Sequence, residues 1–155
     1  MYMVNEFQVE EYRLLKVSIG CFQDSTEVTW HLLRCTGQRL WQTSGKARND
    51  WVWVDTGNEE CYGALRGCFP AQLCTIFKLR NTVNDRVDRL VLVDHLFAEN
   101  SGKPHDASRL VMMIKMGSVA STTIFNIKRI LGMAHLVPEL AARDNKRWYV
   151  NNQID

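Results

Sequence analysis

The stretch Arg48-Asn49-Asp50-Trp51-Val52-Trp53-Val54-Asp55 decides the fold of this chain. Side chains alternate along a strand, so the two tryptophans share one face and the two valines take the other. A run that is apolar on both faces is typical of a central strand. Turn residues follow at Thr56-Gly57-Asn58, and a second extended run is predicted from Tyr62 to Gly67.

Runs rich in β-branched and aromatic residues recur on both sides of this strand. Segments 12–22 and 27–36 predict a hairpin whose first strand places Leu15, Val17 and Ile19 on one face. Segment 123–131 predicts a strand that leads into one turn of helix. Further strands are predicted at 89–97, 110–116, 133–137 and 147–151. Segment 71–80 could be helix or strand, and its run Cys74-Thr75-Ile76-Phe77 favours strand. Turns, loops or breaks are predicted at 37–47, 67–70, 81–88, 98–108 and 117–121.

Seven or eight short strands with little helix predict a mostly β fold. Such a pattern fits a barrel or a sandwich, and we expect a single β-barrel with one or two short helices, because closing a sheet removes its edges. Residues 1–13 are predicted to be an N-terminal tail, and residues 14–155 to form the single barrel domain. The sequence stops at Asp155 without capping residues, so we expect it to be part of a longer protein.

Composition limits the classes of partner and location. The formal net charge is only +2, whereas domains built mainly to grip phosphates are usually far more basic. The five cysteines are odd in number and no signal peptide precedes them, which predicts reduced thiols in a nuclear or cytoplasmic protein that is not secreted. Charged residues interrupt every apolar run well before the roughly 18 residues of a membrane span, so no membrane partner is expected.

Metal and cofactor chemistry has little support in the sequence. Six residues separate Cys61 from Cys68 and five separate Cys68 from Cys74, which is wider than the two to four typical of a zinc knuckle. Buried thiols are the preferred interpretation. No glycine-rich phosphate-binding fingerprint is present, so we expect no cofactor.

Catalytic motifs are also missing. His95 follows Asp94, but adjacent strand residues point to opposite faces, so the pair cannot form a simple orienting contact. His135 lies in an apolar run, where a core histidine is the plainer interpretation. There is no Gly-x-Ser-x-Gly motif. We therefore expect neither enzymatic activity nor a small-molecule substrate; an enzyme would need His95 or His135 beside a cysteine or a carboxylate.

Aromatic residues are the leading candidates for a binding site. A peptide-binding aromatic pocket is predicted from Trp41, Trp51, Trp53 and Tyr62. Aromatic rings attract cations such as methylated lysine through their negative faces, and an acidic residue nearby (Asp50, Asp55, Glu59 or Glu60) would add a charge partner. Ordinary packing of the same rings in a core is the competing interpretation.

A basic stretch before the tryptophan strand gives an alternative. It predicts a nucleic-acid-binding surface made of Arg34, Arg39, Lys46 and Arg48 together with Lys128 and Arg129. Such a surface would bind DNA with an affinity that falls steeply with salt. A solvated loop would account for the same charges.

The order of several segments resembles two known kinds of protein. Over about residues 48–155 the chain resembles the β-rich region near the carboxy end of Plavaka-type and related proteins of fungal transposable elements. The segments that carry this resemblance are 48–54, 62–67, 70–73, 89–93, 100–102, 132–139 and 147–155. The resemblance brings no established biochemical activity, and the catalytic carboxylate motifs of a transposase are not seen.

The second resemblance is to bromo-adjacent homology (BAH) domains, the β-rich modules of chromatin proteins. It is carried by Asp50-Trp51-Val52-Trp53-Val54, by residues 127–137 and by the closing Trp148-Tyr149-Val150. Together the resemblances imply a BAH-like β-barrel in a transposon-derived fungal protein, acting as a non-catalytic interaction module. The implied partner is a chromatin protein or histone tail, and a DNA-binding accessory domain is the alternative.

Overall fold

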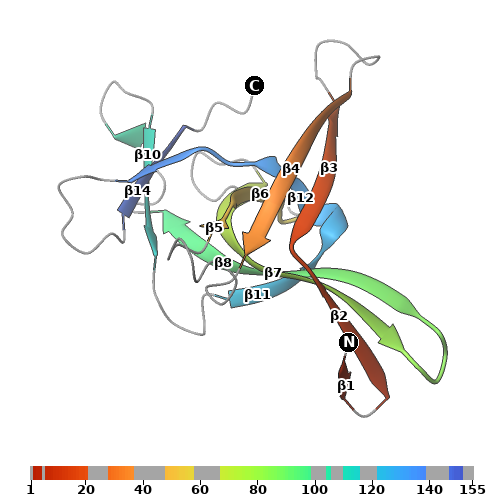
Figure 1. Ribbon diagram of the computed structural model, residues 1–155. Helices are drawn as coiled ribbons and strands as arrows, with labels where there is room; N and C mark the ends of the chain where they lie inside the picture. The colour runs from red at the N-terminus through yellow and green to blue at the C-terminus, as the bar shows by residue number, and fades with distance from the viewer. Residues whose placement is uncertain are drawn as a thin grey trace, which may run out of the picture.

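The computed structural model describes residues 2–4, 6–20, 28–36, 48–57, 67–98, 104–105, 110–115, 122–138 and 147–151 (Figure 1). These residues are almost entirely strands, which confirms the mostly β class. The strands are β1 (Tyr2–Val4), β2 (Phe7–Tyr12), β3 (Leu14–Gly20), β4 (Val28–Thr36), β5 (Arg48–Asn49), β6 (Trp51–Asp55), β7 (Cys68–Asn81), β8 (Val87–Ala98), β9 (Pro104–His105), β10 (Leu110–Lys115), β11 (Thr122–Asn126), β12 (Ile130–Met133), β13 (Leu136–Pro138) and β14 (Arg147–Asn151). In the described part of the chain, helix is limited to one 3-10 turn, η5 (Ile127–Arg129).

Strand β7 is the strand around which the larger sheet is built. Its 14 residues pair with β8 on one edge, and with β6 and then β2 along the other edge. The register with β8 shifts between Leu73 and Thr75, which leaves Cys74 as the extra residue of a β-bulge. A bulge bends a strand and increases its twist, and this one separates the part that pairs with β6 from the part that pairs with β2.

The remaining strands extend this sheet on both sides. β8 also pairs with β11 and, through its last residues, with β10, which continues to β14 and β13. β6 pairs with β12 on the edge away from β7. Within the described ranges, no ring of paired strands is completed, so these strands do not form the closed barrel that the sequence predicts.

A three-stranded sheet, β3-β4-β5, packs against the larger one. The predicted hairpin is confirmed as β3 and β4, which pair from Leu14↔Arg34 to Gly20↔Val28 and extend upward from the larger sheet in Figure 1. Leu15 and Val17 share a face, as predicted, and pack with Leu33 and Cys35 into the first hydrophobic core.

Strand β6 lies between two hydrophobic cores. Val52 and Val54 are fully buried in the first core. Trp53, on the opposite face, packs with Cys68, Ala134 and Val150 in the second. The predicted central strand with tryptophans on one face and valines on the other is therefore confirmed.

Two predictions are wrong, the N-terminal tail and the break at 67–70. Residues 2–4 and 7–12, predicted to lie in a tail, form β1 and β2, and β2 pairs with β7 from Phe7↔Asn81 to Tyr12↔Ile76. The predicted break at 67–70 is instead the start of β7. Pro70 is tolerated there because pairing with β8 begins only at Ala71, so the N–H that proline lacks is not needed on that edge.

Most other local predictions hold. The expected strand and single helical turn are observed as β11 and η5. The predicted strand 133–137 is interrupted at Ala134 and His135, and its ends belong to β12 and β13. The predicted strands 71–80, 89–97, 110–116 and 147–151 correspond to β7, β8, β10 and β14. Part of the predicted loop 98–108 forms the short strand β9. The predicted loops 37–47 and 117–121 and the strand 62–66 lie outside the described residues.

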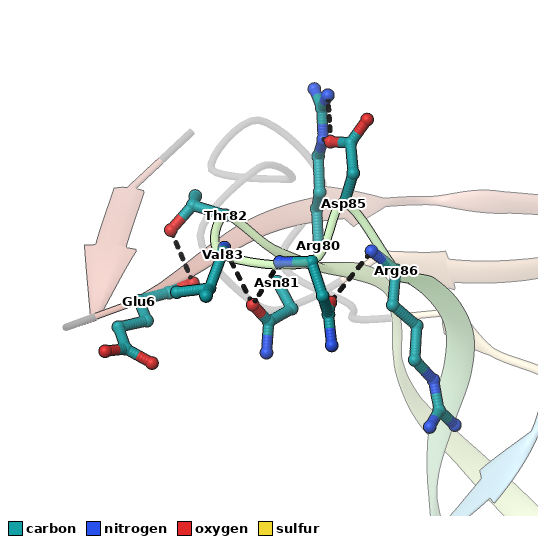
Figure 2. Close-up of polar contacts among 8 residues, drawn as sticks. Glu6, Arg80, Asn81, Thr82, Val83, Asp85 and Arg86 are labelled. Atoms are coloured by element: carbon teal, nitrogen blue, oxygen red, sulfur yellow. Dashed lines mark hydrogen bonds and ion pairs between the residues drawn. The ribbon is translucent and has the colours of Figure 1, made fainter.

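The turn between β7 and β8 is fixed by side-chain contacts (Figure 2). Asn81 Oδ1 accepts hydrogen bonds from the backbone N–H groups of Val83 at 2.9 Å and Asn84 at 3.3 Å. Thr82 Oγ1 donates to the carbonyl of Glu6 at 2.8 Å, which ties the turn to the segment between β1 and β2. Arg80 Nε donates to Asp85 Oδ1 at 2.8 Å. This polar turn confirms the prediction for 81–88.

Candidate binding surfaces

The predicted aromatic pocket is only partly within the described residues. Trp41 and Tyr62 lie outside them. Trp53 is 9% exposed and belongs to the second core, so its ring packs in the interior and is not open to a ligand. Trp51 points to the same side but is only partly buried.

Trp51 is paired with an aromatic residue that was not part of the predicted set. Its ring centroid lies 5.2 Å from that of Trp148, with the ring planes tilted by 55°. Tilted aromatic pairs at this distance are favourable beyond the apolar area that they bury. The two tryptophans form a partly exposed rim on the second core, which we call the tryptophan rim.

Of the four acidic residues predicted to assist this pocket, Glu59 and Glu60 lie outside the described residues, and Asp50 and Asp55 make contacts with the backbone. Asp50 Oδ2 accepts a hydrogen bond from the N–H of Arg34 at 2.7 Å. Asp50 also accepts at its own carbonyl from the N–H of Leu73 at 3.0 Å, so it joins both sheets. Asp55 Oδ1 accepts from the N–H of Gly57 at 2.8 Å, which closes the turn after β6. Both carboxylates therefore have structural roles.

The predicted basic set is divided by the fold. Arg39 and Lys46 lie outside the described residues, and Arg48 pairs through its backbone with Thr36. Arg34 lies beside Asp50 at one end of β6, whereas Arg129 Nη1 donates to the carbonyl of Thr56 at the other end, at 3.1 Å. At roughly 3.3 Å per residue, these ends are about 20 Å apart. Lys128 is exposed next to Arg129, so Arg34 and this pair occupy separate sites.

The hairpin presents a surface that the sequence reasoning missed. Because opposed residues of antiparallel strands point to the same side, the register places six side chains together on the side away from the first core. This outer face consists of Leu14, Lys16 and Ser18 of β3 and Trp30, Leu32 and Arg34 of β4. Leu14 is 54% exposed, Trp30 55% and Leu32 44%. The period-two pattern that buries Leu15 and Val17 also predicts this face, since it leaves the intervening apolar residues outside.

Electrostatics on the outer face favour negative charge. Lys16 Nζ lies 4.5 Å from the centroid of the Trp30 ring, a cation–π distance. Arg34 supplies a second cation, and none of the six residues is acidic. The face therefore combines an exposed aromatic ring, two exposed leucines and two cations.

His95 is surrounded by aromatic rings. It stacks on Phe69, with ring centroids 4.3 Å apart and planes at 16°, and lies 5.8 Å from the Phe125 ring. Burial lowers the pKa of His95, and Asp94 opposes this effect. His135 is exposed. The predicted core setting thus describes His95 rather than His135.

The described cysteines are thiols. Cys35 and Cys68 are buried and Cys74 is partly buried. Burial raises the pKa of Cys68, and burial, with smaller contributions from Cys74, Asp50 and Glu11, raises the pKa of Cys35 to about 11. Cys61 lies outside the described residues. In the part of the chain that the structure describes, no group of three or more His, Cys, Asp or Glu side chains is arranged to hold a metal ion.

A shallow depression of about 260 Å³ lies at the β7–β8 turn and is lined by Phe7, Leu79, Asn81, Asn84, Arg86 and Asp88. It is open and mostly polar, unlike the enclosed and largely apolar sites of small-molecule ligands.

Over the described ranges, no helix is long and apolar enough to cross a membrane.

Comparisons with known proteins found no similar protein. No protein-family model matches the chain, and neither curated proteins nor solved structures give a match.

Proposed function

We propose that this chain is a non-catalytic interaction domain that binds a protein partner. The observation that carries the proposal is the outer face, where three large apolar side chains are about half exposed on two paired strands. Contiguous exposed apolar surface on a folded domain commonly marks an interaction site. Trp and Arg, which are enriched among the residues that dominate binding energy, both occur there.

A chromatin partner is part of this proposal. The BAH resemblance supports it, because the tryptophan strand is β6, the isoleucine-rich segment runs through η5 and β12, and the closing aromatic strand is β14. A BAH-like β fold, origin in a fungal transposon and a nuclear location belong to the same proposal, which rests on resemblance.

A histone tail is the candidate chromatin ligand, and the tryptophan rim is the surface offered to it. Trp51 and Trp148 are partly exposed at the edge of the second core, and ring faces attract the cationic side chains of such a tail. Trp41 and Tyr62 are the further rings proposed to complete the site.

Binding of the purified domain to modified and unmodified histone-tail peptides at physiological salt tests this partner. We expect a selective hit that Trp51→Phe and Trp148→Phe each weaken, since phenylalanine keeps most of the packing but has a smaller ring face. Trp53→Phe is the matched control, because Trp53 lies in the core and should change stability without changing selectivity. A panel without any selective peptide would contradict the histone-tail partner.

DNA binding is the second candidate, favoured by one observation. Arg34 lies with Lys16 on a face without acidic residues. An accessory DNA-binding role would use this face, the basic residues of 34–48 and, at the other end of β6, Lys128 and Arg129. A duplex titration tests it: log Kd should rise linearly with log salt, and no binding at low salt would exclude the role.

A further inference from the structure

The outer face of the β3–β4 hairpin carries two positive charges, from Lys16 and Arg34. None of its six residues is acidic, so no negative charge on the face itself offsets them. A ligand for this face should bring carboxylates or phosphates.

The apolar residues of the outer face distinguish between a ligand with carboxylates and a ligand with phosphates. Leu14 and Leu32 flank the cations and offer nothing to a sugar–phosphate backbone. One side of the Trp30 ring is occupied by the Lys16 ammonium, so a nucleobase stacking there would have to displace it. The sequence pI of about 8.3 is also lower than is usual for domains that bind nucleic acids. The face therefore fits a protein ligand better.

We infer that the outer face binds a short acidic amphipathic helix of a partner protein. The apolar stripe of such a helix would cover Leu14, Trp30 and Leu32, and its flanking carboxylates would pair with Lys16 and Arg34. This inference rests on the proposed interaction function and names the chemistry of one partner. Six residues are far fewer than the roughly 20–30 on each side of a standard interface, so we expect micromolar affinity.

A designed peptide pair tests the inference by fluorescence polarisation. The probe is a labelled amphipathic helix with a leucine stripe flanked by glutamates, and the matched probe has lysine in place of each glutamate. We expect binding of the glutamate peptide to weaken about tenfold in Trp30→Ala and in Lys16→Glu, and the lysine peptide to bind poorly. Val83→Ala and Arg89→Glu are controls, because Val83 in the β7–β8 turn and Arg89 in β8 are both exposed and neither belongs to the outer face.

Three results would overturn the inference. Equal binding of the two peptides would show apolar adhesion without charge recognition. Binding of a single-stranded or duplex oligonucleotide that Trp30→Ala abolishes, with no binding of the glutamate peptide, would assign the face to nucleic acid. Failure of every probe would leave the face without this partner. The histone-tail panel, which depends on the tryptophan rim, decides the chromatin partner separately in each case.

Discussion

The Nδ1 atom of His31 accepts a hydrogen bond from the backbone N–H of Met133 at 3.2 Å, across 102 positions of sequence. His31 lies on the inner face of β4 and Met133 at the end of β12. The contact joins the small sheet to the larger one, and it supplies an acceptor for the partly buried N–H of Met133. It helps to hold the hairpin that carries the outer face.

Replacing His31 by alanine should lower the free energy of unfolding by about 1–3 kcal/mol, because a partly buried N–H loses its acceptor. Urea denaturation measures the change. His135→Ala is the control, since His135 is exposed and should change stability by less than about 0.5 kcal/mol. Equal effects of the two substitutions would show that the hydrogen bond does not stabilise the fold.

His95 should make the fold less stable in acid. Burial lowers its pKa from 6.5, so below that pH the unfolded chain binds a proton that the folded chain does not, and stability falls as the pH falls. His95→Phe keeps an aromatic ring against Phe69 and removes the titration. The stability lost between about pH 7 and pH 5 should be smaller in this variant than in the native chain. His135→Phe is the control variant. A dependence of stability on pH that is the same in His95→Phe as in the native chain would contradict this prediction.

Cys35 should resist alkylation while the protein is folded. Its thiol donates to the carbonyl of Cys74 at 2.6 Å, and its pKa is raised to about 11. Mass spectrometry after iodoacetamide treatment should find Cys35 modified only when urea is added, because the thiolate is the reactive form. Rapid modification of folded protein would refute the buried-thiol assignment.

The same raised pKa predicts a loss of stability at alkaline pH. Between about pH 9 and pH 11 the unfolded chain releases the Cys35 proton first, so stability decreases over this interval. Cys35→Ala should show a shallower decrease, whatever its stability at neutral pH. Parallel slopes for the two proteins would contradict the prediction.

Gly57 should be sensitive to substitution. Its φ angle is +73°, and a Cβ there would meet the Arg129 side chain at 3.5 Å. Gly57→Ala should cost about 1 kcal/mol or more, and Gly57→Asn should cost less because asparagine tolerates left-handed backbone. Thermal unfolding of the two variants gives the comparison, and an alanine variant as stable as the native protein would contradict the expected strain.

Local pattern predicts most of this fold, whereas pairing over long distances does not follow from it. The alternation in β6 and in the β3–β4 hairpin is visible in sequence because each strand has one apolar period and a nearby partner. The place of β2 depends on β7, whose matching residues lie more than sixty positions away. Pro70 indicates a break when read alone, and only the start of β8 pairing at Ala71 explains why it continues a strand.

The candidate surfaces follow the same rule. The pattern that assigns Leu15 and Val17 to the core also assigns Leu14, Lys16 and Trp30 to the opposite face, so the outer face could be predicted from sequence. The partnership of Trp51 with Trp148 could not, since it depends on how β14 reaches the second core. The separation of Arg34 from Arg129 likewise requires the observed position of β6 between them.

The pairing of β2 with β7 sets an order of events during synthesis. Residues 7–12 leave the ribosome before their partners at 76–81, which are made only after all three strands of the small sheet and β6. Until then the edge of β2 that pairs with β7 has no partner strand, and unpaired strand edges are the usual sites of association between nascent chains. Early docking of the β3–β4 hairpin onto β6 would hold the chain compact during this delay. Destabilising that hairpin should therefore lower the soluble yield during expression by a larger fraction than it lowers the free energy of unfolding of the finished protein.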